Sequence, residues 1–517
     1  MARPAWILPL LAAALTLGPI KPAFAAGAAF EPSPLATIDV ETGTLAGQVV
    51  DTVAIYKNVP FAAPPIGPLR WAPPRPAKPW TGVRDATQYG PACPQKINAD
   101  GRPNGGGYVG PTSEDCLTLN IFAPLYARVS AQKTPVMVWI YGGGNSAGAN
   151  SLPSTDGRAF ARDGVLVVEV GYRIGALGFF AHPALTRAAG PREPLVSYGI
   201  MDQIAALKWV KRNIAAFGGD PDNVTIFGES AGGADVLTLM AIPSARGLFQ
   251  KAAVESGGGW SSPVSMAQAE ADGFATARAA GLPADATLDQ LRALPVDALV
   301  RAQERVEPVI DGRLLTETAT QAFARGHAAP VPLLIGSNSY EASLLGPNTS
   351  AYLKNLPADL RRIYAASAPD DLTYANAVFT DSAMGAPARW IAAKASDRPK
   401  SWLYYFSYVR VVRRGRLPGA NHASEIPYVF DTQGLVPNYS AEITDEDRAM
   451  AKVVHSCWVA FVKTGTPSCT GAPAWPSYTP AGDQLMEFGL STGVRTYLRK
   501  AQLDAVQALQ GKLLNGR

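Results

Sequence analysis

Apolar and β-branched residues form short runs that alternate with stretches of helical periodicity along the first half of the chain. Such runs, bounded by turn residues, are typical of buried strands, whereas an apolar residue every third or fourth position is typical of helices. Strands that alternate with helices favour an α/β protein whose large, mostly parallel central sheet is covered by helices on both faces. The predicted strands are residues 117–122, 135–141, 165–170 and 224–227, and the predicted helices are residues 157–163, 201–217 and 234–240.

The second half of the chain interrupts this alternation with helical excursions rich in Ala and Leu, at about residues 260–325 and 350–395. No repeat or linker separates the segments, so the pattern predicts a single domain at residues 26–517. Further elements are predicted at residues 35–50 (an antiparallel hairpin at a sheet edge), 331–336 and 402–406 (strands) and 445–463 (a long helix).

The N-terminus has the pattern of an export signal. Arg3 precedes an apolar run at residues 5–17, and Ala-Phe-Ala follows at residues 23–25. This pattern predicts a signal peptide at residues 1–25 and a secreted or periplasmic mature protein. The run is shorter than the ~20 residues that a membrane span needs, and no other segment is long and apolar enough. We therefore expect no membrane association after signal cleavage.

Composition and charge narrow the partners. The 517 residues are 47% apolar and 17% charged, which is typical of a globular protein with a large core. A formal net charge of +4 is small for this length, so we expect neither nucleic acid nor an anionic membrane as a partner. Nothing in the pattern predicts an oligomeric state.

An exported chain can form disulfides, and this one has four cysteines, which allow three pairings. Proximity in the sequence favours Cys93–Cys116 and Cys457–Cys469, each of which would close a loop rich in Gly and Pro. No cysteine pair lies beside histidines at metal-ligand spacing, so no metal site is predicted.

The sequence Gly-Glu-Ser-Ala-Gly at residues 228–232 joins a predicted strand to a predicted helix, with Ser230 at the apex. So sharp a turn brings backbone segments too close for side chains at the two glycines, and it raises the serine hydroxyl above the sheet edge. The arrangement is that of the nucleophile elbow of serine hydrolases.

Ser230 needs a histidine to accept its proton, and the chain has four. In an α/β-hydrolase the order along the chain is serine, acid, histidine, which excludes His182. His327 follows too soon after Ser230 to leave room for an acid strand, and His455 has the periodicity of a helix packed on the core. His422 remains, in a loop of small residues after a strand.

The acid is expected between Ser230 and His422, just beyond a strand. Glu341 follows the strand at residues 331–336 and satisfies this condition. The rivals are Asp311, in an Asp-Gly turn, and the pair at residues 370–371, which has the pattern of a helix cap. We therefore predict that Glu341 orients the His422 ring and stabilises its protonated form.

The glycines at residues 142–144 end a strand, and their backbone N–H groups can approach a substrate oxygen closely because no Cβ intervenes. The N–H group of Ala231, at the start of the helix after Ser230, would complete an oxyanion hole.

Two long segments resemble signatures of the type-B carboxylesterase/cholinesterase family: residues 217–232, which contain the elbow, and residues 114–124. The resemblance extends over nearly all of the mature chain. It implies an α/β-hydrolase fold whose helical insertions form the substrate gorge. It also implies a triad of Ser230, Glu341 and His422, with Gly143, Gly144 and Ala231 as oxyanion donors.

The resemblance implies further pairs as well: a Cys93–Cys116 disulfide and an ion pair between Arg70 and Glu114. Three more residues resemble the polar residues that support the triad in this family, although structural hydrogen bonding alone would equally explain them. They are Glu229, Ser256 and Glu425.

The chain departs from the family pattern at three places. Asn145 stands where relatives usually carry an aromatic residue, which is expected to open or polarise the pocket entrance. Residues 94–115 contain no tryptophan, so the cation–π platform for choline is missing and choline esters are not the expected substrate. The Cys457–Cys469 pair does not match any disulfide that the resemblance implies.

These features predict a secreted serine carboxylic-ester hydrolase that acts on a small-molecule ester through an acyl-enzyme and needs no cofactor. Another acyl hydrolase, such as a lipase or amidase, and a non-catalytic binding protein of the same fold are the alternatives, and the serine, acid and histidine in order disfavour the latter. A cluster of arginines would suit an anionic acyl group, as in polycarboxylate esters of the fumonisin kind, although a solvated surface loop is the favoured explanation. The cluster comprises Arg410, Arg413, Arg414 and Arg416.

Overall fold

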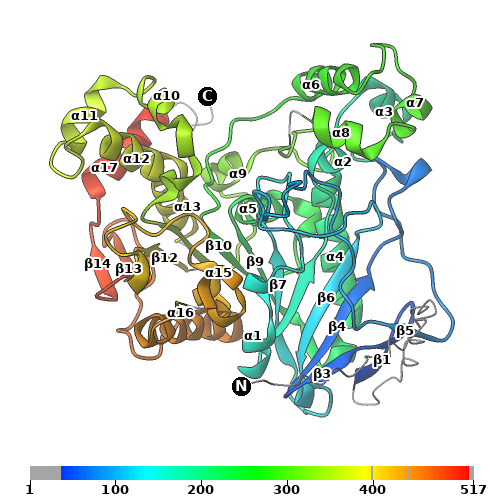
Figure 1. Cartoon of the computed structure of the whole chain (residues 1–517), viewed down its shortest axis with the longest axis horizontal. Coiled ribbons are helices and arrows are strands. Elements are labelled where there is room, and N and C mark those ends of the chain that lie inside the picture. The colour runs from blue at the N-terminus through cyan, green and yellow to red at the C-terminus, as the bar shows by residue number, and fades with distance from the viewer. Residues whose placement is uncertain (1–35, 304–305, 397–399, 441, 512–517) are drawn as a thin grey trace, which may run out of the picture. The chain divides into compact units, whose positions relative to one another are not determined.

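The computed structural model describes residues 36–303, 306–396, 400–440 and 442–511, all within one compact unit, Pro32–Arg517 (Figure 1). The predicted signal peptide lies outside the described residues. An eleven-stranded sheet runs through the unit in the order β14-β13-β12-β11-β10-β9-β7-β8-β6-β4-β3. The strands are β3 (Gln48–Val50), β4 (Val53–Pro60), β6 (Thr118–Pro124), β7 (Thr134–Ile140), β8 (Leu166–Val170), β9 (Gly219–Glu229), β10 (Lys251–Glu255), β11 (Leu333–Asn338), β12 (Ser401–Phe406), β13 (Gln484–Phe488) and β14 (Gly493–Thr496).

The seven strands from β8 to β13 in this order pair in parallel, and antiparallel strands flank them at both ends. Every residue of β8, β10 and β11 is buried, which explains why the central strands are continuous apolar runs rather than alternating ones. The predicted mostly parallel sheet is confirmed.

The predicted N-terminal hairpin forms at the edge of a second, smaller sheet. Strands β1 (Thr37–Val40) and β2 (Gly43–Ala46) pair antiparallel. They join β5 (Val83–Asp85) in a separate three-stranded sheet, and β3 forms the edge of the large sheet instead. The partner strand β5 lies almost forty positions further along the chain, a pairing that hydrophobic alternation cannot reveal.

Helices cover both faces of the large sheet (Figure 1). On one face, aromatic rings near α14 and α1 pack on the central strands. Phe430, just after α14, contacts Trp139 of β7. Phe160 of α1 contacts Phe430 and also His455 of α16. The other face carries the helix that follows Ser230. The helices of the first face are α1 (Arg158–Arg162), α14 (Ile426–Val429) and α16 (Asp445–Thr464), and those of the second are α4 (Tyr198–Asn213), α5 (Ala231–Ala241), α9 (Ala319–Arg325) and α13 (Ala386–Ala395).

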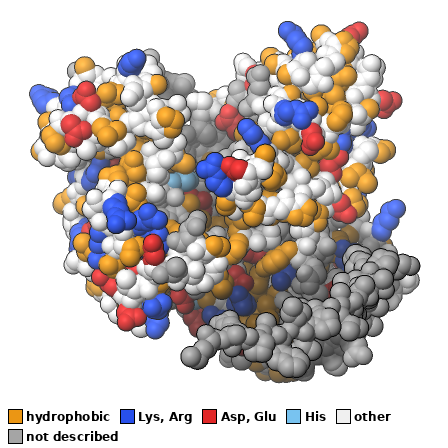
Figure 2. All heavy atoms as spheres, viewed as in Figure 1, with side chains coloured by type: hydrophobic (Ala, Val, Ile, Leu, Met, Phe, Trp, Pro, Cys, Tyr) orange, Lys and Arg blue, Asp and Glu red, His pale blue; other side chains and the backbone are white. Residues whose placement is uncertain are grey.

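The two helical excursions stand above the C-terminal ends of the parallel strands. Figure 2 shows the surface hollowed between these two groups of helices, with a histidine side chain visible in the hollow. The first excursion contains α6 (Met266–Ala279), α7 (Leu288–Arg292), α8 (Val296–Ala302) and α9, and the second contains α10 (Thr349–Leu353), α11 (Ala358–Tyr364), α12 (Asp371–Thr380) and α13. The remaining helices are α2 (Gly175–Phe179), α3 (Pro183–Ala188), α15 (Pro437–Ser440) and α17 (Lys500–Leu509).

Candidate active site

Ser230 lies between the end of β9 and the start of α5, with φ 56° and ψ −126°. This backbone conformation is unfavourable for a residue with a side chain, and the surrounding turn enforces it. A Cβ atom on Gly228 would lie 2.5 Å from backbone atoms of Gly232, and one on Gly232 would lie 2.1 Å from the carbonyl oxygen of Ile140. Both glycines of the motif are therefore sterically required for this turn.

Glu341 and His422 meet above the sheet, from loops that follow β11 and β12. The Nδ1 atom of His422 lies 2.6 Å from Oε2 of Glu341. Glu341 is fully buried, and its Oε1 accepts hydrogen bonds from the backbone N–H of Asn338 and the hydroxyl of Ser256, each at 2.6 Å. These donors fix the carboxylate, which in turn fixes the orientation of the imidazole ring and leaves Nε2 facing away from Glu341.

Ser230 and His422 line the same cavity, of about 800 Å³, together with Glu229 and the glycines at residues 142–144. His422 Nε2 lies 3.1 Å from Oε1 of Glu229, close enough for an ion pair but without the geometry of a hydrogen bond. Burial opposes a charge on the His422 ring, but the nearby carboxylates of Glu229 and Glu341 outweigh it and raise the pKa of His422 above its ordinary value. The site therefore stabilises the positive charge that the imidazole acquires when it accepts a proton.

Buried carboxyl groups surround this histidine. Burial raises the pKa of Glu229 to about 7 and that of Glu425 to about 8, and it raises the pKa of Glu255 well above its ordinary value. Glu425 accepts a hydrogen bond from the side chain of Asn338. Several buried negative charges so close together would repel one another, so we expect only part of these carboxyl groups to be ionised at neutral pH. Glu255 was not predicted from the sequence. Its only signal was its own charge at the end of a short strand, directly before Ser256.

The glycine loop at residues 142–144 passes directly beside Ser230. A Cβ atom on Gly142 would lie 3.0 Å from Cβ of Ser230. Gly143 and Gly144 have φ values of 101° and 63°, a region that glycine enters without strain. Among the described residues, neither of their N–H groups donates to an acceptor. Two backbone donors are thus available next to the serine.

The other candidates for base and acid have separate structural roles. His182 caps α3, His327 is exposed and 2.9 Å from Glu317, and Nδ1 of His455 lies 2.7 Å from the carbonyl oxygen of Val429. Asp311 accepts hydrogen bonds from three successive backbone N–H groups of its turn, and Asp370 caps α12. These contacts give each of these five residues a structural role that does not depend on catalysis.

Both favoured disulfides, Cys93–Cys116 and Cys457–Cys469, are present in the structure. The expected ion pair is also present, with Arg70 Nε 2.7 Å from Glu114 Oε2. In the part of the chain that the structure describes, no helix is long and apolar enough to cross a membrane. The described residues also contain no group of three or more His, Cys, Asp or Glu side chains that could hold a metal ion.

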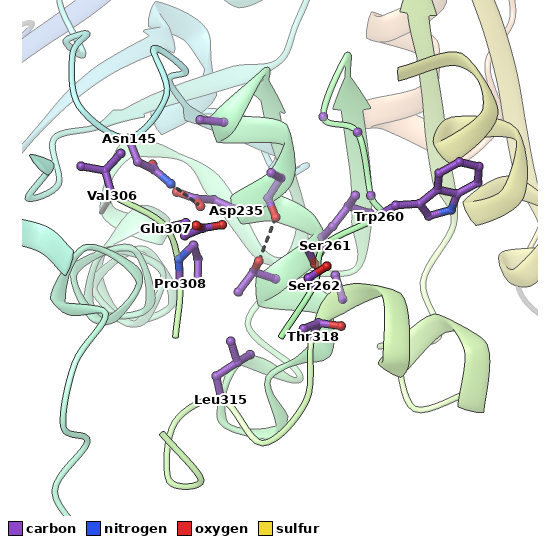
Figure 3. A pocket seen from close by; sticks show the side chains of 18 of the residues that line it. Asn145, Asp235, Trp260, Ser261, Ser262, Val306, Glu307, Pro308, Leu315 and Thr318 are labelled. Atoms are coloured by element: carbon purple, nitrogen blue, oxygen red, sulfur yellow. Dashed lines mark hydrogen bonds between the residues drawn. The ribbon is translucent and has the colours of Figure 1, made fainter. Parts of the chain in front are cut away.

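A second cavity, of about 620 Å³, adjoins the glycine loop and the start of α5 (Figure 3). Gly144 and Ala231 line it at one end. Asn145 also lines it, and its side chain is buried and donates a hydrogen bond to Asp235. No sequence pattern pointed to the other polar and charged residues of this wall, which are Asp235, Thr238, Ser261, Ser262, Asp272, Glu307 and Thr318.

The arginine cluster divides in the structure. Arg410 stacks on Tyr439 at 4.3 Å and lies 3.4 Å from Glu442, and Arg414 pairs with Glu446. Arg410 and Arg413 line a cavity of about 170 Å³ that also contains His422. Arg416 is exposed and does not line it. Only part of the cluster therefore reaches the neighbourhood of the candidate site.

The sheet, the elbow and the loops that follow β11 and β12 define an α/β-hydrolase. Solved structures agree: a thermophilic PNB esterase has a TM-score of 0.79 at 33% identity, with 91% of this chain and 100% of that chain covered. A carboxylesterase of Geobacillus stearothermophilus has a TM-score of 0.78 at 32% identity, with 91% and 99% covered.

The chain belongs to the carboxylesterase family, whose model matches residues 34–377 and 358–506. It is 36% identical over 471 residues to para-nitrobenzyl esterase of Bacillus subtilis, covering 85% of this chain and 92% of that relative. It is 34% identical over 487 residues to fumonisin B1 esterase of Sphingopyxis macrogoltabida, covering 88% and 86%. The protein is accordingly a carboxylic-ester hydrolase, and the non-catalytic alternative is not supported.

Proposed function

We propose that the protein is a secreted serine esterase in which Ser230 is the nucleophile, His422 the base and Glu341 the acid. The observation that carries the proposal is the hydrogen-bonded Glu341–His422 pair, at 2.6 Å, in the same cavity as the serine at the apex of the elbow. The predicted signal segment and the two disulfides support export.

In the first half of the reaction, Nε2 of His422 takes the proton of the Ser230 hydroxyl while the serine oxygen attacks the ester carbonyl carbon. The N–H groups of Gly143, Gly144 and Ala231 stabilise the negative oxygen of the tetrahedral intermediate. The C–O bond to the alcohol then breaks, and the leaving alcohol receives the proton from His422. Glu341 holds the ring and stabilises its positive charge in each of these steps.

In the second half, His422 takes a proton from water, and the resulting hydroxide attacks the carbonyl carbon of the acyl-enzyme. The ester bond to Ser230 breaks, the proton returns to the serine oxygen, and the carboxylic acid leaves. Protein side chains and backbone supply every group in this sequence. Because Glu229 lies 3.1 Å from Nε2, its charge adds to the stabilisation of the imidazolium.

The two cavities can accommodate the acyl group and the alcohol of an ester separately. The cavity of about 800 Å³ is lined by Ser230 and His422, and the cavity of about 620 Å³ is lined by Gly144 and Ala231, two of the proposed oxyanion donors. The carbonyl oxygen must point between these donors, so the acyl group and the alcohol extend into different cavities.

Labelling with a fluorophosphonate tests the function. We expect one phosphonyl group per chain, with the loss of ester hydrolysis in proportion to labelling, because the reagent mimics the tetrahedral intermediate. Peptide mass spectrometry should locate the group on Ser230. Complete labelling with activity retained, or labelling at another residue, would overturn the proposal.

A second candidate is an esterase specialised for anionic acyl groups. It rests on Arg410 and Arg413, which line the small cavity beside His422, and on the similarity to a relative named fumonisin B1 esterase. A guanidinium group can bind a carboxylate through two parallel hydrogen bonds. An acyl carboxylate reaching this cavity would therefore be recognised by charge.

Kinetics with paired substrates separate the two candidates. If the protein recognises anionic acyl groups, Arg413→Ala should lower kcat/KM for an ester with a free acyl carboxylate by about tenfold or more, as expected for a lost charged hydrogen bond. The neutral isostere should be hydrolysed as before, and Arg416→Ala, the matched control outside the cavity, should change neither rate. Equal effects on the charged and neutral esters would exclude the specialised function.

A further inference from the structure

A buried polar cluster lies directly behind the glycine loop. The side chain of Asn145 donates from Nδ2 to Oδ1 of Asp235 at 3.2 Å, and Nε2 of Gln203 donates to Oδ2 of Asp235 at 2.6 Å. Asp235 is 0% exposed and Asn145 is 5% exposed. Figure 3 shows the bond between Asn145 and Asp235 at the wall of the cavity. The proposed reaction uses none of these three side chains.

Asp235 connects the two structural elements that carry the proposed oxyanion donors. It lies four residues after Ala231 in α5, so the two residues are one helical turn apart on the same face of the helix. Asn145 follows Gly144 directly in the chain. The hydrogen bond between Asn145 and Asp235 therefore spans from the glycine loop to the nucleophile helix, across 90 positions of sequence.

Asn145 itself is held in an unusual backbone conformation, with φ 54°. Left-handed backbone is unfavourable for a residue with a side chain, so surrounding contacts must maintain it. Besides the bond to Asp235, the carbonyl oxygen of Asn145 accepts from the N–H of Gly175 at 2.6 Å, and the hydroxyl of Tyr172 lies 3.4 Å from its Oδ1. These contacts hold the residue that directly follows Gly143 and Gly144 in the chain.

Burying the carboxyl group of Asp235 costs free energy, which a purely structural contact between neutral side chains would avoid. Burial raises the pKa of Asp235 to about 7, even though the hydrogen bonds from Gln203 and Asn145 favour the ionised form. The two side chains that donate to Asp235, Asn145 and Gln203, are both neutral amides. Oδ2 of Asp235 accepts from Gln203, which leaves Oδ1 facing Asn145. An apolar side chain at this position could bind neither amide.

We infer that Asp235 is a positioning residue that, through Asn145, fixes the Gly143 and Gly144 amides relative to the Ala231 amide. The inference rests on the proposed function, because it concerns the oxyanion hole of that reaction. Amide donors stabilise an oxyanion only when they point at its position in advance of the reaction. Loss of the link should therefore weaken binding of the transition state more than binding of the substrate.

Two variants remove the link in different ways. Asp235→Leu keeps approximate side-chain size without hydrogen-bond acceptors, and Asn145→Gly removes the amide while glycine adopts φ 54° without strain. In each, we expect kcat to fall about 10- to 100-fold with KM within about twofold of the wild type, and a boronic acid inhibitor to bind more weakly by a similar factor. The double variant should be no slower than the slower single variant, because both changes break one connection.

Asp235→Asn is the matched conservative variant. Its carbonyl oxygen can still accept from Asn145, and its new amide can donate to Oε1 of Gln203, which has no partner among the described residues, once the Gln203 amide rotates. We expect this variant to retain kcat within about threefold of the wild type. A loss equal to that of Asp235→Leu would overturn the inference.

Ser230→Ala is assayed in parallel to separate this inference from the function. If Ser230→Ala is inactive while Asp235→Leu and Asn145→Gly keep wild-type kcat and inhibitor affinity, the positioning role fails and the esterase mechanism stands. If Ser230→Ala keeps its activity, the mechanism itself fails. Asn145→Gly keeps the experiment decisive should Asp235→Leu not fold, since glycine suits the backbone at that position.

Discussion

Ser230→Ala is expected to lower kcat for ester hydrolysis by at least about 10⁴-fold. Without the hydroxyl, no acyl-enzyme can form, and only the binding site and the oxyanion donors remain to assist direct attack by water. The measurement is the steady-state hydrolysis of a chromogenic ester, with enzyme concentrations high enough to detect the residual rate.

The matched control for this variant is Ser491→Ala, which replaces an exposed serine that lines neither of the two cavities beside the glycine loop. It should keep kcat within about twofold of the wild type, as expected for a surface hydroxyl that the reaction does not use. Thermal unfolding followed by circular dichroism should show that both variants are folded. Hydrolysis by Ser230→Ala within tenfold of the wild-type rate would contradict the assignment of the nucleophile.

His422→Ala should be nearly as inactive, with kcat lower by about 10⁴- to 10⁶-fold, because the serine hydroxyl then has no base at the Nε2 position. Glu341 would still accept hydrogen bonds from Ser256 and from the backbone of Asn338, so we expect the variant to fold. The same steady-state assay measures the loss, and added imidazole should restore part of the activity by occupying the space of the missing ring.

His327→Ala provides the control for the choice among the four histidines. His327 is exposed and contacts Glu317 on the surface, so its removal should leave kcat unchanged within about twofold. The prediction for His422 is wrong if His327→Ala is the more damaging change, or if His422→Ala keeps more than a tenth of the wild-type activity.

The sequence was sufficient for those parts of the fold whose signals are local and strong. Strands β7 and β8 and the second half of β9 are mostly apolar runs next to turn residues, and their burial on both faces makes them recognisable. Strand β10 (Lys251–Glu255) is short, has charged ends and contains two alanines, so it lacks this signal. The pairing of β2 with β5 depends on contacts between distant segments, and the pattern of apolar residues does not contain that information.

Some parts of the candidate site were likewise predictable from the sequence, and others were not. The elbow is predictable because Gly228 and Gly232 are required within two residues of Ser230, and chain order then restricts the acid and the histidine to the loops after β11 and β12. The partnership of Asn145 with Asp235 was not predictable, because it depends on how the glycine loop packs against α5. The same limit applies to the arginines, since the course of their loop decides which of them face His422.

The most direct test of the account is to trap the acyl-enzyme. The wild-type protein is mixed with a chromogenic ester, quenched in acid within the first turnovers, digested and analysed by mass spectrometry. The proposed mechanism predicts one acyl group per chain, attached to Ser230, and an initial burst of alcohol wherever deacylation is the slower step. An acyl group on another residue, or trapped acylation that persists unchanged in Ser230→Ala, would contradict it.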